Sequence, residues 1–346
     1  MMRKISNSCT TTMAVCLVAC SALTALASLL PKAQAADGTL VEKGRYVATA
    51  ADCLACHTAP GGKPFAGGYP IITPVGTIYS TNITPSPKTG IGDYTKAEFF
   101  NAVRLGIGHN GKRLYPAMPY TSYAAVTDDD MEALYAFFRS GVVPVEQENR
   151  PDNVRFPFNI RSGMMLWNWL YLDTRTFQPR PGETPQIARG RYLVDHLEHC
   201  GTCHTPRTLF MGPASGRSLS GSVVGAWYAP NITTDKIAGI AEWTDSDLRN
   251  YLKSGHALNK GQAAGPMAEV VTNSTRLLTS DDIDAIIAYL RDVPAIASSE
   301  KRSRTSYEGA GRPEEVARGQ INPDDRGWKI FRGSCASCHQ AQGQGA

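Results

Sequence analysis

The pattern Cys-x-x-Cys-His occurs three times in this chain and constrains its fold more than any other feature. The copies are CLACH at 53–57, CGTCH at 200–204 and CASCH at 335–339. Two thiols on one helical turn can each bond to a vinyl group of a haem, and the histidine that follows can then ligate the iron. The other cysteines, at positions 9, 16 and 20, lie in an N-terminal leader, so none is left over for a structural disulfide.

This spacing predicts covalent haem c, with its iron, at the first two motifs, and the third motif is a candidate for a further haem. A thioredoxin-like redox pair would need a βαβ setting, which the sequence does not indicate. A structural zinc site would need two ligand pairs close together in the chain, whereas these motifs are far apart. We expect attachment through Cys53, Cys56 and His57, through Cys200, Cys203 and His204, and through Cys335, Cys338 and His339.

The haem motifs lie within an internal repeat. Lys43-Gly-Arg-Tyr46 precedes the first motif and Arg189-Gly-Arg-Tyr192 the second, while Arg326-Gly-Trp328 precedes the third. After the first two motifs, Asn82-Ile-Thr84 corresponds to Asn231-Ile-Thr233. The first two units are therefore expected to be copies of one fold, and a third unit is expected to begin in the same way.

Helix signals recur at equivalent positions of the first two units. Thr95–Glu98 and Thr244–Asp247 are predicted to be capping boxes, in which the threonine caps the helix and the acid reaches back to it. Thr127–Asp130 and Thr279–Asp282 predict the same device at the start of a last helix, whose apolar residues recur every three or four positions. An N-terminal helix that ends in the haem motif and a C-terminal helix packed against it, with loops around the haem, are typical of an all-α, class I cytochrome c domain.

A methionine at equivalent positions of the two units is the expected second axial ligand. Met118 and Met267 each lie 36 positions after the asparagine of Asn-Ile-Thr, in loops with proline and small residues. His/Met ligation raises the reduction potential and closes the sixth position, which favours electron transfer over peroxide or oxygen chemistry. Core packing is the alternative for these methionines, and His109 and His256 are the alternative ligands. The predicted metal ligands are His57, Met118, His204, Met267 and His339.

The N-terminus predicts export from the cytoplasm. Residues 1–35 combine a basic start, an apolar run and the small-residue sequence Ala33-Gln-Ala35, so we expect a signal peptide cleaved after Ala35. Lipidation at Cys20 is the alternative. The formal net charge is +4 with no basic stripe, so nucleic acid is not an expected partner. We see no recognisable binding site for NAD or FAD and no recognisable set of catalytic residues in the sequence.

Several segments together resemble one known family. CLACHTAPGGKPFAGG, TPVGTIYSTNITPSPKTGIGDYT, LYPAMPY, CGTCHTPR and GPMAEVV occur in the order found in the three-haem cytochrome c subunit of bacterial membrane-bound dehydrogenases. The resemblance implies that a separate large subunit, dependent on flavin or quinone, oxidises gluconate, an alcohol or sorbitol. It implies further that this chain relays the electrons to ubiquinone, at the membrane surface on the periplasmic face of the bacterial inner membrane.

The repeat and its linkers predict the domain organisation. We expect a signal peptide at 1–35, cytochrome c domains at 36–145 and 188–296, linkers at 146–187 and 297–325, and the start of a third domain at 326–346. We expect this third domain to be truncated, because no methionine follows His339 at the spacing of the first two units.

The linker at 146–187 carries Phe156-Pro-Phe158 and an apolar run at 164–172, which is too short to span a membrane. We expect it to pack between domains, with contact to a dehydrogenase or to a lipid surface as the alternative. For the whole chain, a free periplasmic electron carrier and a self-contained haem peroxidase are the alternative functions.

Overall fold

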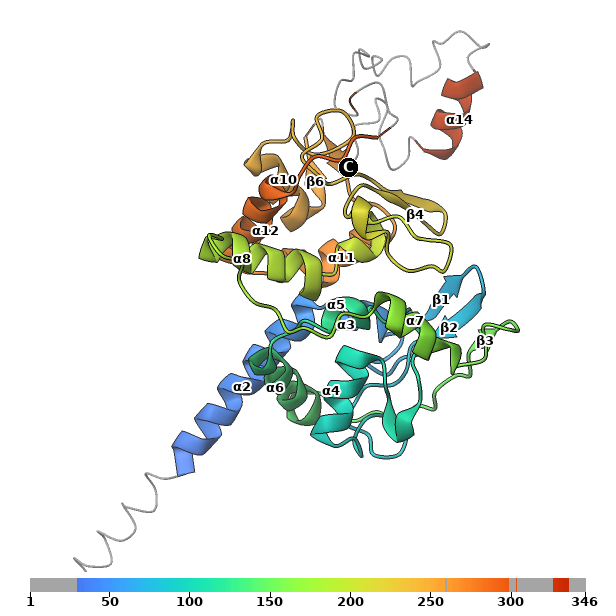
Figure 1. Cartoon of the computed structure of the whole chain (residues 1–346), viewed down its shortest axis with the longest axis vertical. Helices are drawn as coiled ribbons and strands as arrows, with labels where there is room; N and C mark the ends of the chain where they lie inside the picture. The colour runs from blue at the N-terminus through green and yellow to red at the C-terminus, as the bar shows by residue number, and fades with distance from the viewer. Residues whose placement is uncertain (1–29, 259, 299–302, 304–325, 336–346) are drawn as a thin grey trace, which may run out of the picture. The chain divides into compact units, whose positions relative to one another are not determined.

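The computed structural model describes residues 30–258, 260–298, 303 and 326–335 (Figure 1). It divides into two compact units, residues 1–301 and 302–346. The expected signal peptide lies outside the described residues except for positions 30–35, which belong to the first helix. Of the third haem motif only Cys335 is described, and Cys338 and His339 lie outside the described residues.

The larger unit contains both copies of the internal repeat. The first copy begins with helix α2 (Leu30–Ala50) and the single turn α3 (Cys53–Cys56), and its last helix is α6 (Asp128–Ala136), extended by the π-helical turn η2 (Phe137–Gly141). The elements between and after these are β1 (Pro70–Thr73), β2 (Gly76–Tyr79), α4 (Lys96–Leu105), η1 (His109–Gly111), α5 (Tyr120–Tyr123) and β3 (Asn153–Val154).

The second copy follows the same order. It begins with α8 (Pro185–Tyr192), the π-helical turn η3 (Leu193–Leu197) and the short helix α9 (Gly201–His204), and it ends with α12 (Ser280–Asp292). Between them lie η4 (Ser215–Arg217), β4 (Ser222–Val224), β5 (Trp227–Ala229), α10 (Asp245–Ser254), β6 (His256–Ala257), β7 (Gly261–Gln262), α11 (Pro266–Asn273) and η5 (Thr275–Leu277). Helix α7 (Gly163–Tyr171) connects the two copies.

In each copy the first helix packs against the last helix at a glycine. A Cβ atom at Gly44 of α2 would lie 1.9 Å from the carbonyl oxygen of Ala133 on α6, and one at Gly190 of α8 would lie 1.9 Å from that of Ala285 on α12. No side chain fits at such a distance, so these glycines allow the two helix backbones to touch. The expected packing of the first and last helices is therefore observed in both copies.

The capping boxes predicted on α4 and α10 are confirmed. The hydroxyls of Thr95 and Thr244 accept hydrogen bonds from the backbone N–H groups of Glu98 and Asp247. The two carboxylates in turn accept from the backbone N–H groups of the threonines. At the start of each helix, two backbone N–H groups that have no acceptor within the helix are thereby satisfied.

At α6 and α12 only half of the predicted device forms. Thr127 and Thr279 cap their helices by accepting from the backbone N–H groups of Asp130 and Asp282. The carboxylates of these two aspartates do not reach back to the threonines, so the prediction of complete capping boxes is wrong here. The reason is that a tyrosine of the other copy of the repeat takes their place. It accepts from the backbone N–H group of the threonine and donates to the carboxylate of the aspartate.

The two copies meet through a reciprocal pair of tyrosines and aspartates. Tyr46 on α2 donates a hydrogen bond of 2.6 Å to Asp282 at the start of α12. Tyr192 on α8 donates one of 2.7 Å to Asp130 at the start of α6. Because each copy supplies one donor and one acceptor from equivalent positions, the contact has approximate two-fold symmetry within a single chain.

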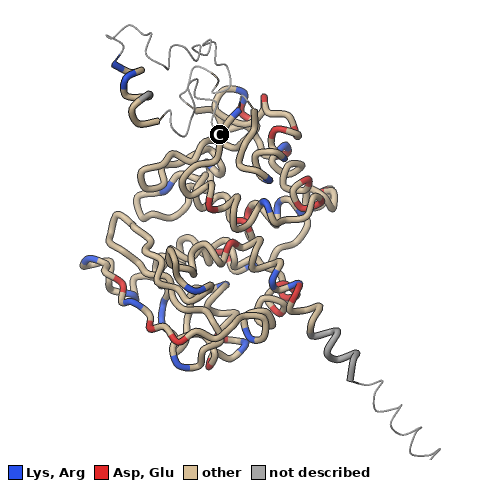
Figure 2. Tube along the Cα trace, turned by 180° about the vertical axis from the view of Figure 1, so that it is seen from behind, with Lys and Arg blue, Asp and Glu red and all other residues tan. Residues whose placement is uncertain are grey.

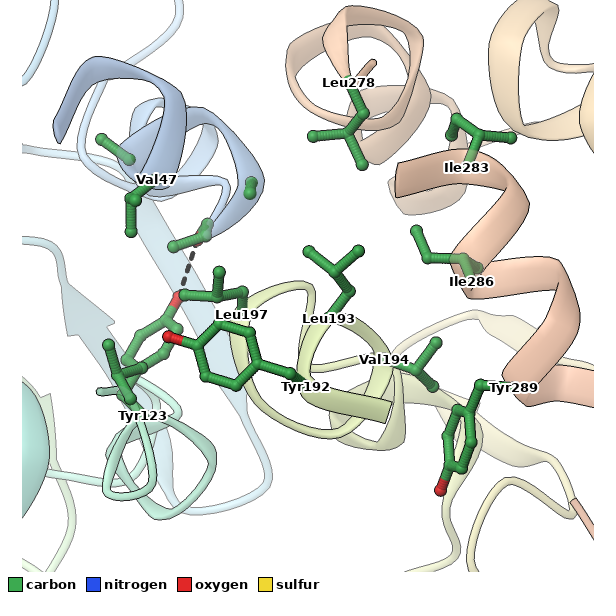
Figure 3. Close-up of a cluster of buried hydrophobic side chains, with 14 of the residues drawn as sticks. Val47, Tyr123, Tyr192, Leu193, Val194, Leu197, Leu278, Ile283, Ile286 and Tyr289 are labelled. Atoms are coloured by element: carbon green, nitrogen blue, oxygen red, sulfur yellow. Dashed lines mark hydrogen bonds between the residues drawn. The ribbon is translucent and has the colours of Figure 1, made fainter. Parts of the chain in front are cut away.

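One hydrophobic core continues through this contact (Figure 3). Leu193 and Leu197 of η3 are at most 1% exposed and lie between α2, which contributes Val47, and α12, which contributes Ile283. Tyr123 of α5 donates a hydrogen bond of 2.7 Å to the carbonyl oxygen of Ala51, the one drawn in Figure 3. The packing of the two copies is thus apolar at its centre, with the tyrosine–aspartate pairs beside it.

Two histidines outside the haem motifs also lie in this contact. The Nδ1 atom of His196 is 3.1 Å from the carbonyl oxygen of Ser122, and the ring of His199 meets that of Tyr123 edge to face at 5.5 Å. Burial lowers the pKa of each histidine to about 4, so both are neutral near pH 7. They act as packing residues between the copies.

Helix α7 joins the copies by packing against both. The indole of Trp167 is buried, 6.2 Å from the ring of Tyr120 in the first copy, and its Nε1 donates to the carbonyl oxygen of Phe210 in the second at 3.0 Å. The expectation that the apolar run packs between the copies therefore holds for one side of the helix. The other side is exposed.

Three small antiparallel sheets accompany the helices of the described chain. The all-α expectation did not include these strands. Strand β2 pairs with β1 and also with β3, where Gly76 faces Val154. In the second copy β4 pairs with β5 and β6 with β7. These strands are at most four residues long, which is too short for their alternation to stand out in the sequence.

The smaller unit contributes the helix α14 (Arg326–Ser334), which leads to Cys335. The rings of Trp328 and Phe331 stack on it, with centroids 5.3 Å apart. Most of the expected polar linker at 297–325 lies outside the described residues. Among the helices that the structure describes, none has both the length and the apolar character needed to cross a lipid bilayer.

Candidate haem sites

The first two haem motifs each occupy a separate short turn after the N-terminal helix. We expected the helix to run into the motif, but the residue before the first cysteine has a left-handed backbone in both copies. The φ angle is 48° at Asp52 and 41° at His199. This conformation cannot continue an α-helix, so the chain turns and presents Cys53 and Cys200 on a new axis.

The histidine of each motif is oriented by a backbone carbonyl group. His57 Nδ1 lies 2.7 Å from the oxygen of Thr81, and His204 Nδ1 lies 2.6 Å from the oxygen of Pro230. A carbonyl oxygen can only accept, so Nδ1 must donate, and Nε2 carries the lone pair that an iron requires. Burial also lowers the pKa of His57, which favours the neutral imidazole.

A buried asparagine holds each of these carbonyl groups in place. Asn82 and Asn231 directly follow the two carbonyl-bearing residues and are at most 2% exposed. Each side-chain oxygen accepts from the backbone N–H and from the hydroxyl of the threonine two positions later, at 2.7–2.9 Å. The Asn-Ile-Thr sequences, which we noted only as markers of the repeat, therefore form part of the histidine support.

The amide group of Asn82 continues this support into the segment after the first copy. Its Nδ2 donates to the carbonyl oxygen of Val145 at 2.8 Å, and its backbone N–H donates to Asn149 Oδ1 at 2.6 Å. In the second copy Asn231 Nδ2 donates to the carbonyl oxygen of Ile296, also at 2.8 Å. Each haem motif is thus linked through one asparagine to the chain that follows its last helix.

Within the described chain none of the cysteines of the first two motifs forms a disulfide. Before haem attachment, burial raises the pKa of the Cys53 thiol to about 12 and that of the Cys56 thiol to about 11. A dithiol redox pair needs the opposite, a lowered thiol pKa. Within the described residues no group of three or more His, Cys, Asp or Glu side chains could hold a metal ion by itself.

The two candidate methionine ligands occupy equivalent positions but different local structure. Met118 is half-buried in an irregular segment and packs against the hydrophobic core. Met267, also half-buried, lies in the first turn of α11 and not in the loop that we expected, because Pro266 starts a helix there. The preceding Gly265 faces Trp227, whose ring would lie 2.3 Å from a Cβ atom at that position.

The alternative histidine ligands have other environments. The Nδ1 atom of His109 lies 2.8 Å from Glu98 Oε1, and its ring stacks on Tyr94 at 5.4 Å. His256 is exposed on strand β6. Met211, which follows the second motif, is also exposed. His109 is thus paired with a carboxylate, while His256 and Met211 lie on the protein surface.

The two candidate sites lie on one interface. Helix α3 contacts α11, and a shallow cavity of about 240 Å³ is lined by Leu54 and Ala55 of the first haem motif and by Glu269 of the Met267 helix. Asp52 lies nearby and is only 9% exposed. Burial, with a smaller contribution from Glu269, raises the pKa of Asp52 to about 8.

Two thiols and an oriented imidazole on one turn match the donor set that holds a covalent haem, and the chain has this set twice. The fold and the sites therefore define a c-type cytochrome.

The chain belongs to the cytochrome c family. The family model for cytochrome c matches residues 41–141 and 187–294, which include the first two haem motifs. Membership means that the chain binds haem c, with its iron, through covalent bonds to the protein.

Relatives with assigned roles are similar to this chain over most of its length. It is 44% identical over 320 residues to the gluconate 2-dehydrogenase cytochrome c subunit of Pantoea cypripedii, an alignment that covers 89% of this chain and 70% of the relative. It is 42% identical to the fructose dehydrogenase cytochrome subunit of Gluconobacter japonicus, over 91% of this chain and 67% of the relative. It is 41% identical to the cytochrome c subunit of the quinone-dependent alcohol dehydrogenase of Gluconacetobacter polyoxogenes, over 90% and 67%.

Proposed function

We propose that this chain is the electron-relay subunit of a dehydrogenase complex. It receives electrons from a large subunit dependent on flavin or quinone, which oxidises a sugar, a sugar acid or an alcohol, and passes them to ubiquinone at the periplasmic face of the inner membrane. The observation that most directly supports this function is that two haem motifs, each with its histidine oriented by a carbonyl group, share one interface. Similarity to three dehydrogenase cytochrome subunits supports the choice of partner.

The first haem would be held by Cys53, Cys56 and His57 with Met118, and the second by Cys200, Cys203 and His204 with Met267. Equivalent positions in the repeat and half-burial of both methionines support this ligand set. A third haem would be held by Cys335, Cys338 and His339. The corresponding domains would occupy 36–145 and 188–296, with a third unit beginning at 326.

The bound haem supplies an iron that gains and loses one electron. The protein sets how readily it does so through groups described above. Donation from His57 Nδ1 to the Thr81 carbonyl makes Nε2 a stronger ligand. A thioether from Met118 would stabilise the reduced iron and close the sixth position against small ligands.

The proposal can be tested on the complex from native membranes. The chain is purified in mild detergent, and its reduced haem absorption is followed while gluconate, fructose, ethanol and sorbitol are added in turn, with a sample without substrate as control. Reduction by one substrate, together with a co-purifying large subunit, would support the relay and identify the substrate. Recovery of the chain without a partner, and without reduction by any of the four, would contradict it.

A further inference from the structure

An unusually apolar surface surrounds the exposed side of α7. We call it the α7 surface and define it by six side chains that are each more than half exposed: Phe156, Met165, Leu166, Trp169, Leu209 and Phe210. The exposed fractions include 79% for Trp169 and 91% for Leu209. Isolated exposed apolar residues are ordinary, but a contiguous group of large ones marks an interaction site.

Hydrogen bonds tie two parts of the α7 surface together, helix α7 and the 208–211 loop. Trp167 Nε1 donates to the carbonyl oxygen of Phe210 at 3.0 Å, and the hydroxyls of Tyr171 and Thr208 are 2.8 Å apart. Both bonds come from α7, so the 208–211 loop is fixed beside the helix. The exposed side chains are therefore presented together.

The same surface is rigidly supported from beneath. The guanidinium of Arg161 lies 4.3 Å from the ring centre of Tyr115 and donates to the carbonyl oxygen of Arg113 at 2.6 Å. Tyr120 donates to Asn168 Oδ1 at 2.7 Å. Arg113, Tyr115 and Tyr120 flank Met118 in the sequence. The α7 surface therefore covers the segment that carries the proposed ligand of the first haem.

Charge is absent from the middle of the surface and positive at its edges. Residues 162–172 and 208–216 contain no Lys, Arg, Asp or Glu. Other stretches, such as 64–87 and 218–234, are also free of charge, as the tan parts of the trace in Figure 2 show. The flanking residues Arg155, Arg207 and Arg217 are exposed, and none forms an ion pair within the described residues. Acidic residues near these segments are already paired, as Asp152 is with Arg161.

We propose that the α7 surface binds the headgroup region of an anionic lipid bilayer, with its apolar side chains inserted and its arginines against lipid phosphates. Tryptophan, phenylalanine and leucine between cations are typical of interfacial segments that lie about 5–10 Å deep in a membrane. A protein partner would need roughly one hydrogen bond per 100–200 Å², and of these six side chains only Trp169 carries a polar group. This inference rests on the proposed function, since ubiquinone is dissolved in the bilayer.

Flotation with lipid vesicles tests the proposal on the full-length, haem-loaded chain without any dehydrogenase. Vesicles contain phosphatidylcholine alone or phosphatidylcholine with phosphatidylglycerol. The variant L166E/W169E places two carboxylates on the α7 surface. The control V143E/L277E places two on exposed apolar residues that follow η2 and precede α12 and do not belong to the α7 surface. Circular dichroism and haem absorption verify that both variants are folded.

We expect the parent chain to float with the mixed vesicles and more weakly with phosphatidylcholine. Its partition coefficient should fall by at least about tenfold in L166E/W169E and by less than about twofold in the control. R155Q/R207Q, which keeps the apolar residues, should lose only the preference for phosphatidylglycerol. A parent chain that does not float, or an L166E/W169E chain that floats equally well, would overturn the proposal.

Loss of co-purification with a large subunit in L166E/W169E, without any loss of vesicle binding, would make this surface a protein interface and would also overturn it. Because the vesicles contain no dehydrogenase, failure of lipid binding is separate from failure of the relay function, which the substrate experiment measures.

Discussion

At the scale of single residues, backbone strain directs each haem motif. Asp52 and His199 adopt left-handed conformations at equivalent positions, and such a conformation costs a non-glycine residue about 1–2 kcal/mol. Surrounding packing must therefore hold them, and both residues contact the interface between the copies. The same point of strain in both copies ends the helix where the haem motif must begin.

The buried carboxyl group of Asp52 should make stability fall as the pH rises. Its folded-state pKa of about 8 lies above the ordinary value of 3.8, so the folded protein holds a proton that the unfolded chain releases. This contribution to stability is present below about pH 4 and is lost as the pH rises toward 8, at no more than about 1.4 kcal/mol per pH unit. Asp52→Asn should therefore gain stability over the parent as the pH rises, which thermal melts from pH 4 to 8 would measure.

If Asp52→Asn and the parent chain differ by a constant amount at every pH, the carboxyl group of Asp52 is not protonated in the folded protein. Asp235→Asn is the matched control, since Asp235 is less buried and its carboxylate accepts from the backbone N–H groups of Ile237 and Ala238.

Loss of a proposed methionine ligand should open one haem at a time. Met118→Ala and Met267→Ala should each add about one haem per chain that binds carbon monoxide in the reduced state. Each should also lower the reduction potential of that haem, because the thioether stabilises the reduced iron. Carbon monoxide difference spectra and a redox titration measure both effects. Met165→Ala, on an exposed methionine, should change neither.

A gain of carbon monoxide binding in His109→Ala or His256→Ala, with none in the methionine variants, would assign the sixth ligands to histidine.

The residue scale also shows how far the sequence predicts the sites. The cysteines and histidines could be named because covalent attachment requires their spacing. The carbonyl groups of Thr81 and Pro230 could not, because a backbone acceptor leaves no trace in the identity of its residue. The repeated Asn-Ile-Thr was the available signal, because an asparagine that recurs at equivalent positions of a repeat indicates a structural role.

At the scale of elements, the two helix crossings at Gly44 and Gly190 leave the least room for a Cβ atom among the described glycines. Gly44→Ala places a methyl group on the carbonyl oxygen of Ala133, and Gly190→Ala places one on that of Ala285. Each should destabilise its own copy by about 3 kcal/mol, because a backbone carbonyl cannot move aside without shifting the helix. Urea denaturation followed by circular dichroism measures the change.

Gly38→Ala is the control within the same helix, because a Cβ atom there meets nothing within 4 Å. It should be neutral or stabilising, since alanine favours helix by about 1 kcal/mol over glycine. Equal effects of the three substitutions would show that helix propensity, and not the crossing, governs these positions.

The same scale separates what local patterns can and cannot predict. Caps and periodic apolar residues identified the helices capped by Thr95, Thr127, Thr244 and Thr279, because these signals lie within a few residues of one another. The carboxylates of Asp130 and Asp282 escaped prediction because their partners are distant in the chain. The helical form of the apolar run at 163–171 was also missed, since neither its ends nor its period resembles a standard helix.

At the scale of the whole molecule, the tyrosine–aspartate pairs hold the two copies together. Tyr46→Phe and Tyr192→Phe each remove one hydrogen bond to a carboxylate, while Arg189 still pairs with Asp282 and Lys43 with Asp130. Each variant should lose about 1–2 kcal/mol of stability. In the double variant, calorimetry should show the two copies unfolding at separate temperatures, where the parent shows one transition.

Tyr228→Phe, on an exposed tyrosine, should leave the calorimetric transition unchanged. A single transition in Tyr46→Phe/Tyr192→Phe at the parent temperature would mean that the apolar core alone couples the copies.

The reciprocal contact between the copies is the kind that duplication of a self-associating single-copy protein would produce. A chain made of only one copy would carry both the tyrosine and the aspartate, and would meet a second identical chain through the same self-complementary surface. Gene duplication and fusion would turn such a concentration-dependent pair into one with a very high effective concentration. Once fused, the halves no longer had to remain identical, so one haem site could change its surroundings, as helix α7 does for the first, without loss of the pairing.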